Sequence, residues 1–279
     1  KIVFVGDHNQ MAPVFEKLSP IYNEDGFISD LVEPVRNAGQ PALMALCNQL
    51  RDTVATGIFK PIQEVPGVIE YLDGREMQQK LDTMFLDENV DSRILCYRNK
   101  QVKSFNDYIR LQVRQRGSRY EVGENLICAS GYQPKTGPGL SIEQALEVIR
   151  VSEHTTEQEI KNAKFDTYMM TVKTQFESIN LYVPTDQAHF DAVIDYFRKN
   201  KMWPEYFRMK NGYPDLRPRD AATIYKAQGS TYDSVFLDLD DISRCTQADQ
   251  VARMLYVGAS RCRNKLYLYG KLKAAYRGG

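Results

Sequence analysis

Three short stretches of this chain carry side chains suited to binding phosphate groups. The first, Gly6–Gln10, reads GDHNQ, and its last amide can donate to a phosphate oxygen while accepting from a water molecule. The second, Thr223–Thr231, reads TIYKAQGST and brings hydroxyl, ammonium and amide groups together. The third, Leu255–Arg263, reads LYVGASRCR and contains two arginines, Arg261 and Arg263. The chemistry that these groups share is recognition of a phosphorylated ligand.

The loop that commonly grips the phosphates of ATP is missing from this sequence. Its pattern, G-x-x-x-x-G-K followed by Ser or Thr, occurs nowhere in the 279 residues. Lys1–Val5 reads KIVFV, an apolar run that predicts a buried strand of a parallel sheet, yet no matching strand follows it directly. We therefore expect the chain to be the second half of a larger protein whose first half holds the phosphates.

Composition narrows the class of protein. The length fits one large domain or two ordinary ones, and an apolar fraction of 43% supports a substantial core. The five cysteines are scattered without a C-x-x-C pair, which argues against zinc or a disulfide framework and favours a reducing compartment. No apolar run approaches the roughly 20 residues that span a bilayer, so we expect no membrane partner.

Charge is balanced overall but uneven along the chain. The formal net charge is zero, which argues against a protein that coats nucleic acid without specificity. Two windows are basic: Arg98–Arg119 has seven Lys or Arg against Asp107 alone, and Gln250–Gly279 has seven and no acid. A solvated helix face or tail would explain such windows, but the neighbouring motifs favour phosphate contacts.

The spacing of apolar residues predicts the scaffold that must position these motifs, and the scaffold is of the α/β class. Helices are expected at residues 40–56, 75–88, 99–116, 186–200 and 247–259. Strands are expected at residues 93–97, 234–239 and 265–269. The core stripe of the third helix is expected to contain Val102, Phe105, Ile109 and Val113.

The middle of the chain changes character. Alternating β-branched and aromatic residues predict strands at residues 126–129, 146–152, 167–173 and 179–184. Turn-like stretches at residues 133–139 and 154–164 separate them, which predicts a small antiparallel insert. Asp186 is expected to cap the helix that follows.

The three motifs, in this order, resemble those of superfamily 1 helicases of the RecD-like group, and most closely the Dda-type phage helicases. The resemblance covers nearly the whole chain. It implies two RecA-like domains that share one ATP site, the second interrupted by a small antiparallel, SH3-like β-barrel. On this interpretation residues 1–32 are the tail of the first RecA-like domain, residues 33–119 and 218–279 form the second, and residues 120–217 are a β-rich insert plus a helix.

The resemblance also implies roles on the nucleotide side. Nucleotide-binding residues would be Gly6, Asp7, Gln10, Arg36, Gln228, Gly229 and Arg261. Gln10 and Arg261 are the catalytic candidates, because a glutamine orients the attacking water and an arginine finger neutralises the charge of the transferred phosphoryl group. Arg36, in the run VEPVR, would on its own read as a surface arginine before a helix. The cofactors are ATP and Mg²⁺, with the Mg²⁺ ligands in the missing half and no metal site in this chain.

DNA-binding residues implied by the resemblance are Asn99, Lys100, Thr223, Tyr225 and Lys226. Asn99 also fits a simple helix N-cap, and a helix N-terminus is a natural place to bind a backbone phosphate. Tyr225 stands where the family usually has histidine, so it keeps a ring for stacking but loses the titratable nitrogen. Lys226 could face either phosphate system.

The function implied is that of an ATP-driven translocase on single-stranded DNA, moving 5′ to 3′ by analogy. It would be a monomeric motor in the cytoplasm of a bacterium or a phage-infected cell. The partners would be single-stranded DNA and the missing RecA-like half, and the chain alone should show no ATPase. Two alternatives stay open: a non-catalytic module that binds single-stranded DNA, and part of a viral RNA helicase. A purely structural scaffold is the least specific reading.

Overall fold

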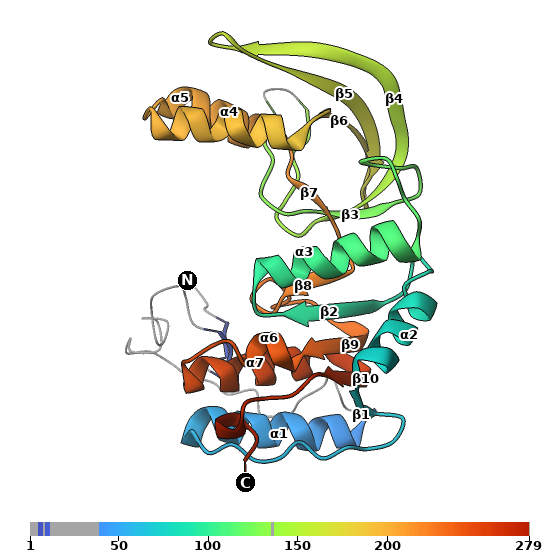
Figure 1. The fold of residues 1–279 in the computed structure, drawn as a ribbon, viewed down its shortest axis with the longest axis vertical. Coiled ribbons are helices and arrows are strands. Elements are labelled where there is room, and N and C mark those ends of the chain that lie inside the picture. Colours follow the sequence, from blue (N-terminus) through green and yellow to red (C-terminus); the bar gives the residue numbers. More distant parts are fainter. Residues whose placement is uncertain (1–4, 8, 12–38, 135–136, 279) are drawn as a thin grey trace. The chain divides into compact units, whose positions relative to one another are not determined.

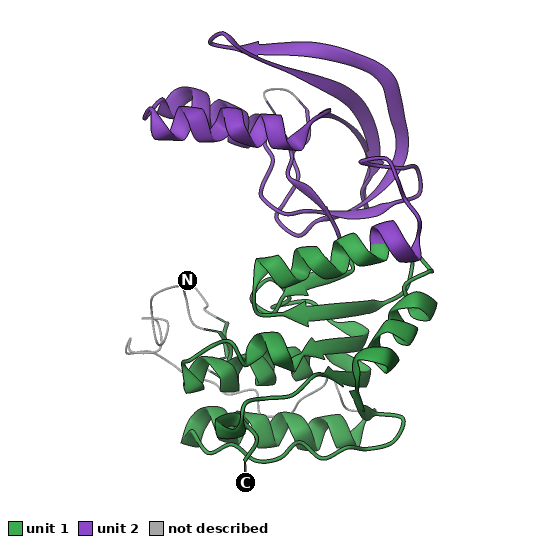
Figure 2. Cartoon of the chain, in the orientation of Figure 1, with its two compact units in different colours: residues 1–109, 220–279 green, residues 110–219 purple. Residues whose placement is uncertain are grey.

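The computed structural model describes residues 5–7, 9–11, 39–134 and 137–278. The chain forms two compact units (Figure 2). Unit 1 consists of residues 1–109 and 220–279, and unit 2 of residues 110–219, where the sequence predicts the insert at 120–217. Unit 2 is therefore inserted into the sequence of unit 1.

Unit 1 is built on a five-stranded sheet in which every pairing is parallel (Figure 1). The order across the sheet is β1 (Ile69–Leu72), β10 (Cys262–Tyr269), β9 (Tyr232–Asp238), β2 (Ser92–Cys96) and β8 (Ala221–Thr223). The central strand β9 is buried almost throughout, as expected of a strand covered on both faces. The carboxyl ends of all five strands lie at one edge, which we call the carboxyl edge, and their starts lie at the amino edge.

Helices cover both faces of this sheet. They are α1 (Pro41–Thr56), α2 (Gly74–Met84), α3 (Asn99–Tyr108) and α7 (Ala248–Ser260), together with the single turn α6 (Leu239–Ile242) and a 3₁₀ turn at Ala274–Tyr276. Leucines of α1 and α7 share one hydrophobic core with Val235 and Leu237 of β9. On the opposite face, Phe85, directly after α2, packs on Phe236 with ring centroids 5.6 Å apart. Helix α3 lies on this second face, where Phe105 packs edge-on against Tyr269.

The helix starts and stops follow local sequence signals. Pro41 occupies the first turn of α1, and Gly57, with φ 73°, ends the helix in the left-handed conformation that glycine favours. Asp73 and Glu76 form a reciprocal capping box at the start of α2. Helix α2 ends at Met84, so the predicted extension to residue 88 was wrong.

The third predicted helix is shorter than expected. Helix α3 ends at Tyr108 and a π-helical turn, Ile109–Val113, follows it. Of the predicted core stripe only Ile109 is fully buried. Asn106 is buried instead, and its side chain accepts from the backbone N–H of Ala221 and donates to the same residue's carbonyl. A polar side chain that bridges to β8 therefore replaces part of the apolar stripe.

Unit 2 contains a second five-stranded sheet, antiparallel throughout. Its order is β6 (Ser178–Pro184), β5 (Ala163–Lys173), β4 (Ala145–Ile160), β3 (Asn125–Cys128) and β7 (Leu216–Pro218). Within the described part of unit 2, no pairing joins β6 to β7, so the ladder is open at both edges.

The hairpin formed by β4 and β5 is longer than the sequence predicted. Its strands continue to Ile160 and from Ala163, and Lys161 and Asn162 make the turn with positive φ angles of 46° and 68°. The predicted turn at residues 154–164 was therefore wrong. Much of this arm of β4 is solvent-exposed on both sides, so it lacks the alternation that identifies a half-buried strand.

Two helices complete unit 2: α4 (Gln187–Lys199) and α5 (Trp203–Gly212). The predicted cap of α4 is confirmed, because the carboxylate of Asp186 accepts from the backbone N–H of His189 at 3.0 Å. Helix α5 was not predicted. The pair forms a small core of its own, in which Phe197 and Met209 join Phe165 of the hairpin.

Several expectations fall partly or wholly outside the described residues. Of the strand predicted at residues 1–5 only Val5 is described, and it is exposed and not in a strand. Arg36 also lies outside the described residues. None of the helices that the structure describes has the length and apolar character needed to cross a bilayer.

Candidate nucleotide and nucleic-acid site

Two predicted DNA-binding segments meet at the carboxyl edge of unit 1. Asn99 and Lys100 are exposed at the N-terminus of α3, directly after β2. Thr223 ends the neighbouring strand β8, where it is in register with Cys96. The N-cap position is occupied by Arg98 rather than Asn99, and no side chain caps the helix. The first backbone N–H groups of α3 and its dipole thus favour an anion at this edge.

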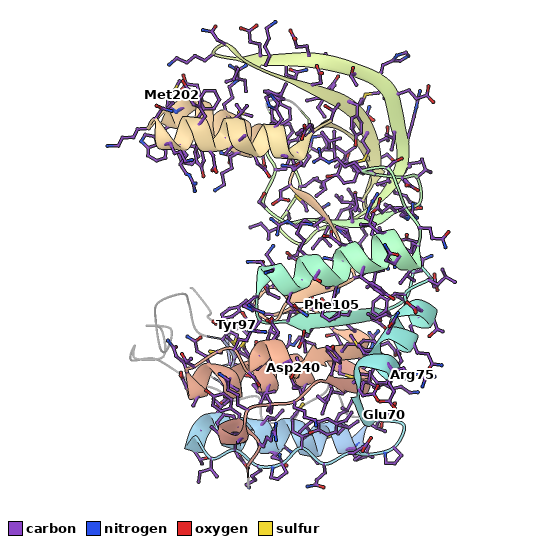
Figure 3. The ribbon with its side chains drawn as sticks, viewed as in Figure 1. Glu70, Arg75, Tyr97, Phe105, Met202 and Asp240 are labelled. Atoms are coloured by element: carbon purple, nitrogen blue, oxygen red, sulfur yellow. The ribbon has the colours of Figure 1, made fainter. Side chains whose placement is uncertain are left out.

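A buried carboxylate fixes the turn that leads into α3. Asp241, in α6, accepts from the backbone N–H of Tyr97 at 2.9 Å and of Arg98 at 2.8 Å. Its other oxygen accepts from Nε of Arg98 at 2.5 Å. Tyr97, labelled in Figure 3, lies at this turn. The turn that carries the DNA-binding candidates is therefore anchored to the carboxyl end of β9. Sequence reasoning missed Asp241 because it lies far along the chain from Arg98.

A second buried acid lies beside the anchor. Asp238, the last residue of β9, caps α6 by accepting from the backbone N–H of Asp241 at 2.9 Å. Its other oxygen, Oδ2, is buried with no hydrogen-bond partner among the described residues. Burial disfavours the ionised form and raises the pKa of Asp238 from 3.8 to about 6. Part of the population is consequently protonated near neutral pH.

This raised pKa predicts how stability should vary with pH. The folded state holds the Asp238 proton more tightly than the unfolded chain, so the contribution to stability is complete below pH 3.8 and is lost as the pH rises through about 6. Asp238→Asn removes the titration and keeps a good N-cap. We expect the variant to be more stable than the wild type by roughly 2 kcal/mol at about pH 7.5. Urea unfolding at that pH and near pH 4.5 measures the difference, which should shrink at the lower pH; a difference independent of pH would contradict the assignment.

The second motif connects the two edges of the sheet. At the carboxyl edge, the Thr223 hydroxyl and carbonyl both accept from the backbone N–H of Lys226, which closes a tight turn. Ile224 and Ala227 are buried in the core of unit 1, so the segment is held against the sheet. It leaves this turn and reaches the amino edge, where β9 begins.

The side chains predicted to work within this motif differ in exposure. Tyr225 is half-buried against the core of unit 1, and burial raises the pKa of its hydroxyl. Lys226 and Gln228 are also half-buried. Gly229 is exposed with φ 86°, a backbone conformation that residues with a side chain rarely adopt.

Arg261 lies at the amino edge, between α7 and β10, and its side chain is buried. The residue is only 1% exposed. Its Nη2 donates to the Ser260 hydroxyl at 2.9 Å and its Nε to the carbonyl of Val257 at 3.2 Å. Nη1 donates to the carbonyl of Ser230, at the end of the second motif, at 3.4 Å. The guanidinium is thus buried among these partners in this structure, and the finger role expected of Arg261 requires it to leave them.

The first motif lies against α7. The hydroxyl of Tyr256 donates to Asp7 at 3.0 Å, and Arg253 donates to the carbonyl of Gln10 at 2.8 Å. The Gln10 amide donates to Asp7 as well, at 3.2 Å. Gly6 is exposed beside this contact. The first and third motifs are therefore brought together, through Tyr256 of the third motif and through Arg253, which lies just before that motif on α7 and was not selected from the sequence.

Electrostatics at this contact favour a charged Asp7. Burial alone would raise the pKa of Asp7, but hydrogen bonds from Asn9, Tyr256 and Gln10 outweigh it and lower the pKa below the usual value. Burial, together with the neighbouring Asp7, raises the pKa of Tyr256 to about 12, so this hydroxyl remains a donor at neutral pH. A neutral donor and an ionised acceptor make a strong hydrogen bond between the two motifs.

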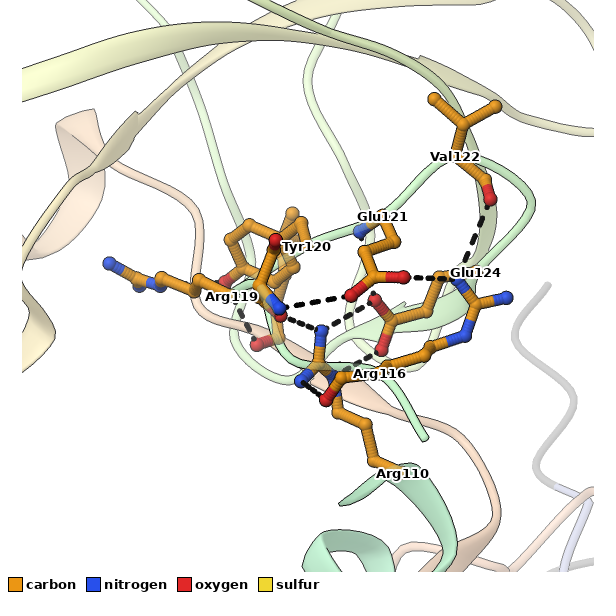
Figure 4. A network of polar contacts seen from close by, with 9 residues as sticks. Arg110, Arg116, Arg119, Tyr120, Glu121, Val122 and Glu124 are labelled. Atoms are coloured by element: carbon orange, nitrogen blue, oxygen red, sulfur yellow. Dashed lines mark hydrogen bonds and ion pairs between the residues drawn. The ribbon is translucent and has the colours of Figure 1, made fainter. Parts of the chain in front are cut away.

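The basic window at residues 98–119 offers fewer cations to a ligand than its composition suggests. In unit 2, Arg110 donates to the carboxylate of Glu124 at 2.7 Å and 3.2 Å, and Arg116 lies 3.6 Å from a carboxylate oxygen of Glu121 (Figure 4). Arg119 donates to the carbonyl of Pro184. Most cations of this window are therefore engaged within the chain, and the exposed Lys100 is the better phosphate contact.

Metal ligands are not clustered in the residues that the structure describes: no group of three or more His, Cys, Asp or Glu side chains could hold an ion there. The second and third motifs instead carry an amide side chain, Gln228, and a guanidinium group, Arg261. Such groups suit phosphate oxygens rather than cations.

Comparison with known proteins points to helicases. Residues 220–269, which contain the second and third motifs, match the UvrD-like helicase C-terminal domain family. The crystal structure of Pif1 helicase from Candida albicans is similar with a TM-score of 0.50 at 14% identity, over 98% of this chain and 64% of that one. Pif1 helicase from Bacteroides, in complex with ADP-AlF3 and ssDNA, gives a TM-score of 0.46 at 16% identity, over 98% and 62%. No curated protein sequence matches the chain.

The structural similarity covers part of a larger protein and comes with low sequence identity. The chain spans less than two thirds of the length of either Pif1 structure. At this level of identity, the likeness to the Candida albicans protein concerns the fold, which is shared over nearly all of the present chain. Residues 220–269 are thus similar to the C-terminal domain of UvrD-like helicases, and unit 1 has a mixed α/β architecture.

Proposed function

We propose that this chain is the C-terminal portion of an ATP-dependent helicase that moves along single-stranded DNA. One observation carries the proposal: the segment Thr223–Thr231 starts beside the exposed N-terminus of α3 and ends in contact with Arg261. A strand bound at the carboxyl edge and a nucleotide bound at the amino edge would therefore act on one packed segment. The family match over residues 220–269, which includes both ends of this connection, supports the proposal.

On the DNA side, five residues would contact the strand. Asn99 and Lys100 present a helix N-terminus and an exposed ammonium group to a backbone phosphate. Thr223 and Lys226 would add phosphate contacts from β8 and the turn after it, and Tyr225 would offer its ring to a base. Contacts of this kind tolerate many sequences and weaken as salt is raised.

On the nucleotide side, Gln10 and Arg261 would act on ATP and Mg²⁺ held by a P-loop domain outside this chain. The other contacts of this chain to the nucleotide would come from Gly6, Asp7, Arg36, Gln228 and Gly229. When the nucleotide binds, Arg261 would exchange the carbonyl of Ser230 for a phosphate oxygen, and this exchange would pull on the DNA-binding segment. The nucleotide supplies phosphoryl-transfer chemistry; this chain positions the water and neutralises charge.

The remaining details of the proposal rest on the resemblance to RecD-like helicases. We propose 5′ to 3′ movement, a monomeric motor, and membership of the RecD-like group close to the Dda-type phage helicases. The antiparallel sheet of unit 2 would correspond to the SH3-like insert of that group and help to guide the strand. Residues 33–119 and 218–279 would form the second RecA-like domain.

The proposal is tested by comparing this chain with the longer protein that contains a P-loop. The chain alone should bind a fluorescent oligothymidylate, measured by anisotropy, and should show no ATPase. The longer protein should hydrolyse ATP, and single-stranded DNA should stimulate the rate. ATP turnover by residues 1–279 alone, or the absence of any binding to the oligonucleotide, would contradict the proposal.

The burial of Arg261 favours one other candidate, a non-catalytic module that binds single-stranded DNA. In that case the guanidinium would serve only to hold α7 and the second motif together. The same two assays separate the candidates, because a longer protein that binds DNA without hydrolysing ATP would support the module. Unwinding assays on matched DNA and RNA duplexes would distinguish a DNA helicase from an RNA helicase.

A further inference from the structure

The helix pair of unit 2 presents an aromatic surface that no motif explains. Tyr196 of α4 is 56% exposed, and Trp203 and Phe207 of α5 are 47% and 50% exposed. Trp203 and Phe207 are four residues apart and so lie on the same side of the helix. The helices already have a core on their inner side, where Phe197 and Met209 are fully buried. The outward rings are therefore not needed to hold the pair together.

The three aromatic rings of α5 form a connected platform. Tyr206 packs edge-on against Phe207, with ring centroids 5.0 Å apart, and against Trp203 at 5.8 Å. Trp203 and Phe207 are tilted relative to each other at 6.5 Å. Helix α5 begins directly after Met202, which is labelled in Figure 3. Rings held by their neighbours lose little freedom when a flat ligand stacks on them.

Basic residues are frequent in the sequence near the platform, although one of them, Arg198, is paired with Asp195 at 2.9 Å. Residues 196–210 contain a single acid, Glu205, which is paired with Lys161 at 3.1 Å. The five basic residues of this stretch are Arg198, Lys199, Lys201, Arg208 and Lys210, and all are exposed. The ammonium group of Lys210 lies 5.6 Å from the centre of the Tyr206 ring. This basic stretch was not identified from the sequence because the helix that carries it was not predicted.

We infer that this surface, the α4–α5 aromatic face (Trp203, Tyr206 and Phe207 of α5 with the exposed basic residues near them in the sequence), binds single-stranded nucleic acid. Exposed rings can stack on bases while the surrounding ammonium and guanidinium groups contact phosphates, the combination that single-strand binding surfaces use. A protein partner fits less well, because lysine is depleted in protein interfaces. The inference rests on the proposed function, since the ligand would be the same strand, but it places a second contact outside the helicase motifs.

Trp203 makes a direct test possible because it is the only tryptophan in the chain. Its fluorescence reports on the α4–α5 aromatic face alone. Titration of residues 1–279 with an oligothymidylate of about 16 nucleotides should give a saturable loss of tryptophan emission. Raising the salt concentration should reverse the loss, since phosphate contacts are screened. The labelled oligonucleotide, followed by anisotropy in parallel, reports on binding to the whole chain.

Variants separate stacking from general binding. The double variant Trp203→Ala/Phe207→Ala should weaken oligonucleotide binding at least about tenfold. The single variant Trp203→Phe keeps a ring at this position and should retain most of the wild-type affinity. Phe176→Ala is the matched control, because Phe176 is an 84% exposed aromatic of the same unit outside the face. This control should bind like the wild type.

The outcomes distinguish this inference from the proposed function. If the oligonucleotide binds by anisotropy while Trp203 emission stays constant, the inference is overturned and the proposed function stands. If the oligonucleotide does not bind at all, the proposed function is overturned, and the inference that rests on it is overturned as well. If emission changes with protein concentration without DNA, the face is a contact between copies of the chain, which also overturns the inference.

Discussion

An Arg261→Ala variant of the longer, P-loop-containing protein should hydrolyse ATP at least about 10³-fold more slowly than the wild type when single-stranded DNA is saturating. An arginine that neutralises charge on the transferred phosphoryl group contributes this much to kcat. Arg263→Ala is the matched control, because Arg263 is exposed and paired with Asp91. Loss of a surface ion pair should change the rate by no more than about fivefold. Oligonucleotide affinity should stay near the wild-type value in both variants.

The buried position of Arg261 adds a second expected effect. Removing the guanidinium leaves the carbonyls of Val257 and Ser230 without this donor, which should cost about 1–3 kcal/mol in the free energy of unfolding. Urea unfolding of the chain measures that loss, and the ATPase is then compared at a temperature where both proteins are folded. A folded Arg261→Ala variant with a normal rate would show that the residue is only structural.

Asp241→Ala should produce the largest loss of stability, about 3 kcal/mol in the free energy of unfolding. The substitution removes the acceptor of two backbone N–H groups and of the Arg98 guanidinium. The side chain of Arg98 is 38% exposed, so water restores part of what it loses, which keeps the estimate at the lower end of the range for buried pairs. Urea unfolding at neutral pH measures the effect.

The same variant should also weaken DNA binding in the folded state, because the turn that Asp241 anchors carries Asn99 and Lys100. Asp91→Ala removes a carboxylate that is paired at the surface with Arg263, and it should alter stability by less than about 1 kcal/mol. Oligonucleotide affinity measured by anisotropy should fall for Asp241→Ala and not for Asp91→Ala. Unchanged affinity in a folded Asp241→Ala protein would mean that the geometry of this turn does not matter for binding.

Elements with strong local signals were predictable from the sequence. Helix α1 was found within one residue of its bounds because Pro41 and Gly57 mark its two ends. The cap of α4 was found for the same reason. Strand β1 was missed because its four residues carry almost no pattern, and its partner in the sheet, β10, lies near the other end of the chain. Helix α5 was missed because its exposed rings obscure the apolar stripe, even though Pro204 lies in its first turn as Pro41 does in α1.

The site shows the same division between local and long-range information. The three motifs could be read from residue types and short spacings, and so could the exposed start of α3. Their partners could not be predicted: Asp241 and Arg253 become neighbours of the motifs only when the sheet has formed. The same holds for the contact between Tyr256 of the third motif and Asp7 of the first. The burial of Arg261 was likewise unpredictable, because the sequence does not reveal which carbonyls lie within reach of its side chain.

The strand order of unit 1 has a consequence for synthesis on the ribosome. Strand β10 comes last in the sequence but lies inside the sheet, between β1 and β9. Until it emerges, β1 has no neighbour and the parallel sheet is left divided, whereas all strands of unit 2 are contiguous in residues 110–219. Unit 2 can therefore fold before residues 262–269 have been synthesised, whereas the sheet of unit 1 is completed only once those residues have emerged. A nascent chain stopped before Cys262 would contain a folded unit 2 and an incomplete sheet in unit 1.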